Sequence, residues 1–161
     1  MTGEGKRRGS AERVRRYLES HGMADQIHTF EAPTKTAQMA ADAMGCELGQ
    51  IVKSLVFVVG EKPVLALVAG DRRGDTEAIA SLAGGGTARF ADPQTVRDTT
   101  GYAIGGVSPF DLPDSVMVLL DDSLSRFEIV YPAGGTPTTM VQMSLEDLVR
   151  LSRGNMVRIS L

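Results

Sequence analysis

The chain has 161 residues, of which 42% are hydrophobic and 23% charged, which suits one domain with a sizeable core but not two. Its net charge of −3 argues against a protein that coats DNA or long RNA through a basic surface, although it allows a local contact with one phosphate-bearing end. Because no apolar run approaches the roughly 18 residues that span a bilayer, and because the first residues lack the apolar segment of a signal peptide, we expect a cytosolic protein that binds neither DNA nor membranes.

The first predicted elements are a tail and a packing helix. Residues 1–9 are rich in glycine and basic residues and are expected to form a disordered tail, which leaves 10–161 as the folded domain. Ser10 can cap a helix from Ala11 to about His21, in which three apolar side chains recur at helical spacing. We therefore expect one face of this helix to pack on the core.

A short strand and a second helix follow. Residues 27–31 alternate like a strand, and Thr36 begins a helix whose small side chains favour close packing on a sheet. Cys46 lies just past the expected end of this helix and is the only cysteine, which excludes an internal disulfide and a cysteine-cluster metal site. Its position favours a small buried hydrophobic residue over a nucleophile.

The most unusual stretch is residues 50–59, an apolar and β-branched run that predicts a strand covered on both faces but contains Lys53. A lysine there is costly unless its amine reaches water, a carboxylate or an anionic ligand. Either the amine extends to solvent at the end of the strand, or it binds an anion in a cleft. A turn at 60–63 and a second apolar strand at 64–69 complete a hairpin.

The second half of the chain predicts short elements joined by turns. Helices are expected at 76–82, 93–100 and 144–151, and strands at 89–91, 116–120, 127–131, 140–143 and 155–159. The pair Asp121 and Asp122 indicates a capped turn and not a metal site, because no further ligands accompany it at suitable spacing. With about seven strands, five short helices and no regular βαβ alternation, we expect one α+β domain, in which a mixed, mostly antiparallel sheet curls around a core and helices pack outside.

A glycine-rich loop at 101–110 is the other candidate for chemistry. Gly105 and Gly106, followed by Pro109, form a rigid bend whose peptide N–H groups no side chain shields. Such a bend is either a simple turn or a backbone cradle for a carbonyl or a developing oxyanion. His21 and His28 lie in no serine, cysteine or metal-binding pattern, so a covalent nucleophile is disfavoured and no metal or cofactor is expected.

Several segments in one order carry a family resemblance. They are Ile51–Phe57 with its lysine, Ala91–Pro93, Thr100–Pro109 with a Gly-x-x-x-Pro loop, and Phe127–Tyr131 followed by Ala133, Gly134 and Gly135. Over roughly residues 11–161, this combination resembles the YbaK/EbsC family of free-standing aminoacyl-tRNA deacylases, which are related to the editing insertion of bacterial prolyl-tRNA synthetases.

The resemblance implies an activity and a division of roles. Family members hydrolyse the ester that joins a wrong amino acid to the 3′ end of a tRNA. Lys53 matches the family lysine, which would hold the terminal adenosine or its phosphate. The loop, whose peptide N–H groups would bind the substrate carbonyl, matches Gly105, Gly106, Val107, Ser108 and Pro109. Water or a group of the substrate itself would then attack the ester, so that positioning and charge stabilisation supply the acceleration without a covalent nucleophile, metal or cofactor.

Departures from the family pattern bear on specificity. Members that remove cysteine from tRNA for proline carry Tyr, Ser and Asp where this chain has Phe30, Ala133 and Met140. A pocket without those polar groups would hold a small substrate by shape and apolar contact, which discriminates by only about 1–3 kcal/mol per methylene. We expect a small amino acid such as Ala, Cys, Ser or Thr on tRNA for proline, with an aminoacyl-tRNA synthetase as a candidate partner. Two alternatives stay open: a module that binds the acylated tRNA end without hydrolysis, and a structural or regulatory domain.

Overall fold

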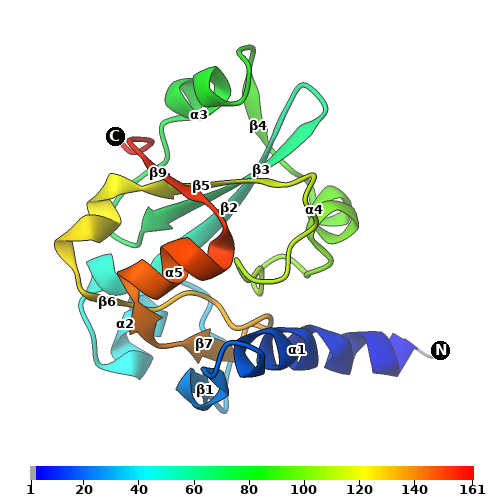
Figure 1. Cartoon of the computed structure of the whole chain (residues 1–161), viewed down its shortest axis with the longest axis vertical. Helices are drawn as coiled ribbons and strands as arrows, with labels where there is room; N and C mark the ends of the chain where they lie inside the picture. The colour runs from blue at the N-terminus through cyan, green and yellow to red at the C-terminus, as the bar shows by residue number, and fades with distance from the viewer. Residues whose placement is uncertain (1–2) are drawn as a thin grey trace.

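The computed structural model describes residues 3–161, and its largest element is a mixed five-stranded sheet (Figure 1). The strands, in the order β4-β2-β3-β5-β9, are β4 (Ala88–Phe90), β2 (Val52–Val59), β3 (Lys62–Ala69), β5 (Met117–Asp121) and β9 (Asn155–Val157). The first three are antiparallel neighbours, whereas β5 and β9 continue the sheet in parallel. The hairpin expected around the lysine strand is therefore confirmed as β2 and β3.

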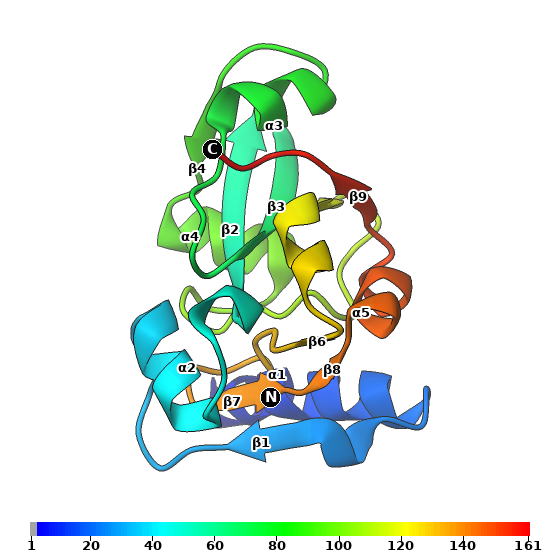
Figure 2. The ribbon, with the colours of Figure 1, turned by 90° about the vertical axis from the view of Figure 1, so that its left-hand side faces the viewer.

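Two small sheets and five α-helices complete the domain. The small sheets pair β1 (Ile27–Thr29) with β7 (Thr139–Val141) and β6 (Ile129–Val130) with β8 (Met143–Ser144). The α-helices are α1 (Gly3–Glu19), α2 (Ala37–Met44), α3 (Thr76–Leu82), α4 (Pro93–Thr100) and α5 (Leu145–Ser152), and short 3-10 helices lie at Ala24–Gln26, Leu48–Gln50 and Asp122–Arg126. Figure 2 shows α3 at one end of the hairpin and α1, β1 and β7 at the opposite end. The fold is a single α+β domain, as the sequence predicts.

Capping side chains begin the helices where the sequence indicates. Thr36 accepts a hydrogen bond from the Met39 N–H at 3.1 Å, and Asp92 accepts one from the Thr95 N–H at 2.7 Å. The expected capped turn after β5 is also present, because the buried Asp121 carboxylate accepts a hydrogen bond from the Ser123 N–H at 3.0 Å. It accepts a second from the N–H of Ile159, after β9, at 2.8 Å. These local bonds satisfy donors that a helix or turn otherwise leaves unpaired.

Two expected boundaries differ from the structure. Helix α1 begins at Gly3, inside the segment that the sequence predicts as a disordered tail, and passes through Ser10 without a cap. No proline interrupts this segment, and Glu, Lys and Arg are good helix formers, so the helix continues toward the N-terminus. Residues 1 and 2 of the predicted tail lie outside the described part of the chain. The strand expected at 127–131 is reduced to β6, because the 3-10 helix before it extends to Arg126.

The two faces of the sheet carry separate cores, which follow from the alternation of side chains along each strand. On one face, Val52 and Val56 of β2 pack in a cluster with α1 and α5. On the other face, Phe57 packs with Ile79 of α3 and with Ile159 near the C-terminus. A third cluster joins α2 to the start of β2 and to β7. The candidate site lies where the first and third clusters meet.

Candidate active site

A cavity of about 380 Å³ lies beside the first half of β2, and its volume is typical of a small-ligand site. Strand β4 pairs only with Phe57–Val59, so no strand covers the earlier part of β2 on that side. The cavity fills this gap. Its lining residues are Thr34, Lys35, Thr36, Ala37, Ala40, Ile51, Val52, Lys53, Ser54, Leu55, Val56, Phe90, Ala91, Val96, Ile104, Gly105, Val107, Ala133, Thr136, Thr139 and Met140.

The gap leaves one peptide unit of β2 open to the cavity. At one end of the gap the Val52 N–H donates to the Tyr131 carbonyl at 3.1 Å, and at the other the Ala91 N–H donates to the Val56 carbonyl at 3.0 Å. Antiparallel pairing sends alternate peptide groups to opposite edges of a strand. The peptide groups of Ser54 therefore point to the same side as those of Val52 and Val56, and they have no backbone partner within residues 3–161.

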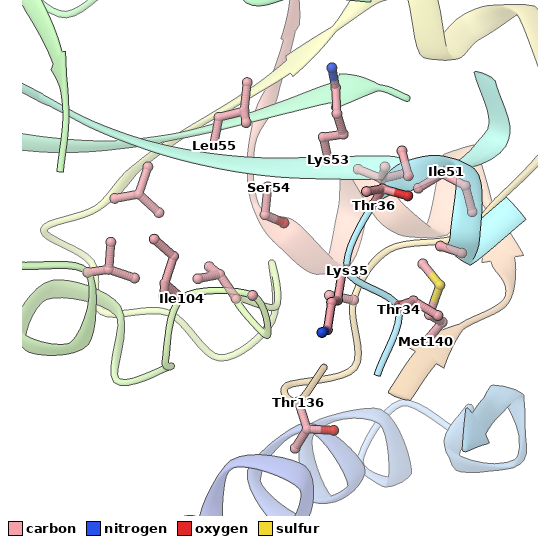
Figure 3. Close-up of a pocket in the computed structure, with 18 of the residues that line it drawn as sticks. Thr34, Lys35, Thr36, Ile51, Lys53, Ser54, Leu55, Ile104, Thr136 and Met140 are labelled. Carbon is pink, nitrogen blue, oxygen red and sulfur yellow. The ribbon is translucent and has the colours of Figure 1, made fainter. Parts of the chain in front are cut away.

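Lys53 and Ser54 point to opposite faces of β2 (Figure 3). The Lys53 amine donates to the carbonyl of Arg72 in the loop after β3, away from the side that Ser54 faces. Burial lowers the pKa of the Lys53 amine, whereas the Asp71 carboxylate raises it in part. The hydroxyl of Ser54 is buried and has no hydrogen-bond partner in the described part of the chain. Lys53 thus lines the cavity, but its charge lies behind the strand in this structure.

Arg13 of α1 holds both ends of the 101–110 loop. Its guanidinium donates to the Thr100 carbonyl at 2.9 Å and to the Asp111 carboxylate at 3.1 Å, and it lies 4.3 Å from the centre of the Tyr102 ring. The Tyr102 hydroxyl in turn donates to the Phe110 carbonyl at 2.6 Å. Tyr102 and Phe110 are both fully buried, so solvent does not reach the hydrogen bond between them, whereas the Arg13–Asp111 contact is exposed.

Within the loop, two glycines serve different purposes. A Cβ atom on Gly106 would lie 2.8 Å from the Thr136 Cα atom, so the close approach of the two backbones requires glycine. Gly105 has a φ angle of +89°, which other residues rarely adopt. The Gly106 N–H donates to the Ala103 carbonyl at 3.0 Å, whereas the N–H groups of Gly105 and Val107 have no hydrogen-bond partner among the residues that the structure describes. The N–H groups of Ala103, Ile104, Ser108 and Phe110 also have no partner in this part of the chain, so the loop has several free donors, of which those of Gly105 and Val107 belong to residues that line the cavity.

The structure separates the predicted loop residues into two groups. Gly105 and Val107 line the cavity, whereas Gly106, Ser108 and Pro109 are buried and do not line it. The expectation that the whole Gly-x-x-x-Pro segment contacts substrate therefore finds geometric support at two positions. The other three residues pack beneath the cavity and determine the path of the backbone.

The three expected specificity positions come together around the third cluster. Met140 is paired with His28 in the β1–β7 sheet and forms an isolated bridge with Ala133, and both Met140 and Ala133 line the cavity. Phe30 packs against the same cluster, and its N–H donates to the Thr138 carbonyl at 2.8 Å. Phe30 does not line the cavity, so its contact with a ligand would pass through Met140.

Sequence reasoning missed one wall of the cavity. Thr34, Lys35 and Thr36, which precede α2, all line it, and so do several hydroxyl-bearing residues from other segments. In Figure 3 the Lys35 side chain extends toward Thr136, on the side of β2 that Ser54 faces. The cap at Thr36 could have revealed this wall, because the residues before a cap lie beside the unpaired N–H groups at the start of the helix.

The cavity carries positive charge without negative charge. Its two charged lining residues are Lys35 and Lys53, and none of the lining residues is Asp or Glu. Within residues 3–161, no three His, Cys, Asp or Glu side chains are grouped so as to hold a metal ion. None of the helices in the described part of the chain has the length and apolar character needed to cross a membrane. The lining therefore combines hydroxyl groups, free peptide groups, apolar side chains and lysine.

Comparisons with known proteins agree on one family. Residues 31–151 match the model of the aminoacyl-tRNA editing domain. The uncharacterized protein YwhH of Bacillus subtilis is 33% identical over 144 residues, which cover 89% of this chain and 91% of YwhH. The multifunctional Ser/Thr-tRNA deacylase ProXp-y of Escherichia coli K12 is 30% identical over 146 residues, which cover 87% of this chain and 86% of ProXp-y. A crystal structure described as that of a candidate trans-editing enzyme for prolyl tRNA synthetase superimposes with a TM-score of 0.86 at 38% identity and covers 94% of this chain and 97% of its own.

Proposed function

Because the chain belongs to the aminoacyl-tRNA editing domain family, we propose that it is a deacylase that hydrolyses the ester of a mischarged tRNA. The family match spans the whole cavity from Thr34 to Met140. The observation that carries the proposal is that the loop residues Ile104, Gly105 and Val107 line the cavity and that their N–H groups have no hydrogen-bond partner in the described part of the chain, while the base of the loop is buried. Donors held in this way can stabilise the charge that develops on an ester carbonyl oxygen.

The proposed reaction needs positioning more than it needs a reactive side chain. No Cys, His, Asp or Glu lies among the residues that line the cavity. Water, or a group of the substrate itself, would attack the ester while Gly105 and Val107 bind the carbonyl oxygen. An attacking group held in the right geometry reacts far faster than one in free solution.

We propose that Lys53 contributes to holding the tRNA end, as the family resemblance implies. Its amine lies on the Arg72 carbonyl with Arg73 nearby, so this part of the molecule is positively charged apart from Asp71. Asp71 is itself paired with Arg126 at 2.7 Å. Release of the Arg72 carbonyl would free the Lys53 amine for the terminal adenosine or its phosphate.

We propose that the acyl group transferred to water is that of a small amino acid, with the tRNA 3′ hydroxyl as the leaving group. Ala133 and Met140 offer an apolar wall of modest size, and the hydroxyl groups of Ser54 and Thr136 offer polar partners. The name of ProXp-y as a Ser/Thr-tRNA deacylase supports a hydroxyl-bearing amino acid, and the matched trans-editing structure supports tRNA for proline. Ala and Cys are the apolar alternatives for the same space, and a prolyl-tRNA synthetase is the proposed partner.

The test is a panel of tRNAs for proline charged with Ala, Cys, Ser or Thr, incubated with wild type and with Lys53→Ala. We expect wild type to release at least one amino acid, and the substitution to slow release by roughly ten- to a hundredfold because a charge-assisted contact is lost. Lys62→Ala, which removes an exposed lysine at the start of β3, is the matched control and should behave like wild type.

Two outcomes would contradict the proposal in different ways. If wild type protects the ester from spontaneous hydrolysis, the protein is a binding module and not a deacylase. If folded Lys53→Ala protein releases amino acid at the wild-type rate, the deacylase stands but the role of Lys53 does not. Thermal unfolding of each variant shows whether it is folded.

A further inference from the structure

We propose that Lys35 binds the phosphate that joins the terminal nucleotide of the substrate to the rest of the tRNA. This inference rests on the proposed deacylase function and extends it to a residue that the Lys53 motif does not include. It makes Lys35 a positioning residue, which holds the nucleotide so that the ester reaches the free N–H groups of Gly105 and Val107.

The position of Lys35 is set by its two neighbours. The Thr34 N–H donates to the Pro137 carbonyl at 3.0 Å, which ties the segment to the loop before β7. Thr36 caps α2 through its contact with the Met39 N–H at 3.1 Å. Lys35 lies between these two fixed points, and its side chain extends toward Thr136 on the cavity side of β2 (Figure 3). The backbone therefore directs Lys35 to the cavity.

The amine of Lys35 has no partner of its own in the described part of the chain. No hydrogen bond or ion pair joins it to another of these residues, and no carboxylate lines the cavity. Lys53 differs on each point, because its amine bonds to the Arg72 carbonyl and lies in the field of Asp71. A lysine that faces a cavity without a counter-charge is suited to an anionic group of the ligand.

The chemistry of an aminoacylated 3′ end identifies that anionic group. The phosphodiester is the anion of its terminal nucleotide, whereas the free α-amino group of the amino acid is a potential cation. Near Lys35 the phosphate is attracted and a charged amino group is repelled. Binding of the phosphate at Lys35 therefore favours a pose in which the charged amino group of the acyl end lies away from the Lys35 amine.

The experiment compares two small substrates that differ by one phosphate. The amino acid found active on tRNA is esterified to the ribose of adenosine or of adenosine 5′-monophosphate, and kcat and KM are measured for wild type, Lys35→Gln, Lys35→Arg, Lys53→Ala and Lys62→Ala. We expect wild type to prefer the phosphorylated substrate by roughly ten- to a hundredfold in kcat/KM, mainly through KM.

Lys35→Gln should lose most of this preference, and its rate on the adenosine ester should change far less than its rate on the phosphorylated ester. Lys35→Arg should retain the preference, and Lys62→Ala should match wild type. A role of Lys35 that is only structural would lower the rates on both substrates together and would overturn the proposal. Loss of the preference in Lys53→Ala, with Lys35→Gln unaffected, would overturn it as well and would assign the phosphate to Lys53.

A second measurement uses intact aminoacyl-tRNA. The logarithm of kcat/KM should fall less steeply with the logarithm of salt concentration in Lys35→Gln than in wild type, by about 0.7 in slope for one lost phosphate contact to a single strand. An unchanged slope would contradict the assignment even if neither small substrate reacts. If wild type hydrolyses no aminoacyl-tRNA at all, the proposed function fails, which this design separates from failure at Lys35 alone.

Discussion

Two walls of the cavity are held in different ways. The 101–110 loop is tied at its base by Arg13 and by the hydroxyl of the buried Tyr102, and its Gly106 lies against the backbone of Thr136. The segment before α2 is tied at Thr34, whose N–H and hydroxyl both donate to the Pro137 carbonyl, and at Thr36, which accepts from the N–H groups of Met39 and Ala40. The side chains at 35 and 36 are exposed.

This difference matches the work that each wall would do. Catalytic donors must be held close to their final positions before the substrate arrives, because a small displacement removes much of the rate. An RNA end is held by charge, which tolerates a range of positions. The 101–110 loop, whose base is buried, therefore suits the ester, and the segment before α2 suits the nucleotide.

The largest effect is expected from Gly106→Ala. The added methyl group would lie 2.8 Å from the Thr136 Cα atom and 3.0 Å from the Gly135 carbonyl oxygen, so one of the two backbones must move. We expect kcat/KM for deacylation to fall on the order of a hundredfold, and the free energy of unfolding to fall by about 1–3 kcal/mol. Steady-state kinetics and denaturant unfolding measure the two effects.

Gly74→Ala is the matched control for an added methyl group. Its Cβ atom would meet its nearest neighbour, the Leu55 side chain, at 3.4 Å, which is an ordinary contact, and its φ angle is not positive. This variant should keep wild-type kinetics. Equal activity of Gly106→Ala and wild type would show that the loop is not held as closely as described.

Tyr102→Phe tests the base of the loop alone, with stability as the readout. The substitution leaves the Phe110 carbonyl buried without its donor, and the free energy of unfolding should fall by about 1–3 kcal/mol at neutral pH. If urea unfolding shows that the variant is as stable as wild type, the Tyr102 hydroxyl does not stabilise the loop.

The same residue predicts a pH dependence. Burial raises the pKa of Tyr102 from 10.0 to about 12. Between these values the unfolded chain loses the phenolic proton while the folded protein keeps it, so the folded state binds more protons and its stability falls as pH rises. Unfolding measured from pH 9 to pH 12 should show a steeper loss for wild type than for Tyr102→Phe, and parallel curves would contradict the shift.

The smallest effect is expected on the exposed wall, from Thr36→Ala. Loss of the cap on α2 should lower the free energy of unfolding by about 1 kcal/mol, and deacylation should change less than in Gly106→Ala. Thr36→Ser keeps the capping hydroxyl and should restore stability in a thermal melt. A loss of activity as large as that of Gly106→Ala would show that this wall also requires exact placement.

Local rules predicted much of the fold. The hairpin of β2 and β3 and the caps at Thr36 and Asp92 follow from short patterns, because turns and caps depend on adjacent residues. The sequence did not predict the start of α1. A serine that can cap a helix, such as Ser10, does not end a helix that neither a proline nor a pair of glycines interrupts.

The candidate site was predicted less completely, because its geometry depends on distant segments. The sequence places Lys53 on a buried strand but does not reveal that its amine lies on the Arg72 carbonyl. It identifies the glycine loop but does not separate the lining residues Gly105 and Val107 from the buried Gly106. Lys35 was missed altogether: the cap at Thr36 places it before a helix start, but the sequence does not show that other segments form a cavity there.

The uncovered edge of β2 also affects how copies of the protein meet in solution. A strand with free peptide groups on one side can pair with the same strand of another molecule. Residues 51–59 form an apolar, β-branched run of the kind that stacks into cross-β fibres, and Lys53 is the only charge in it. Two such strands that meet edge to edge would bring like charges together. The open edge of β2 is thus one place where copies of the protein can pair, and the charge of Lys53 opposes that pairing.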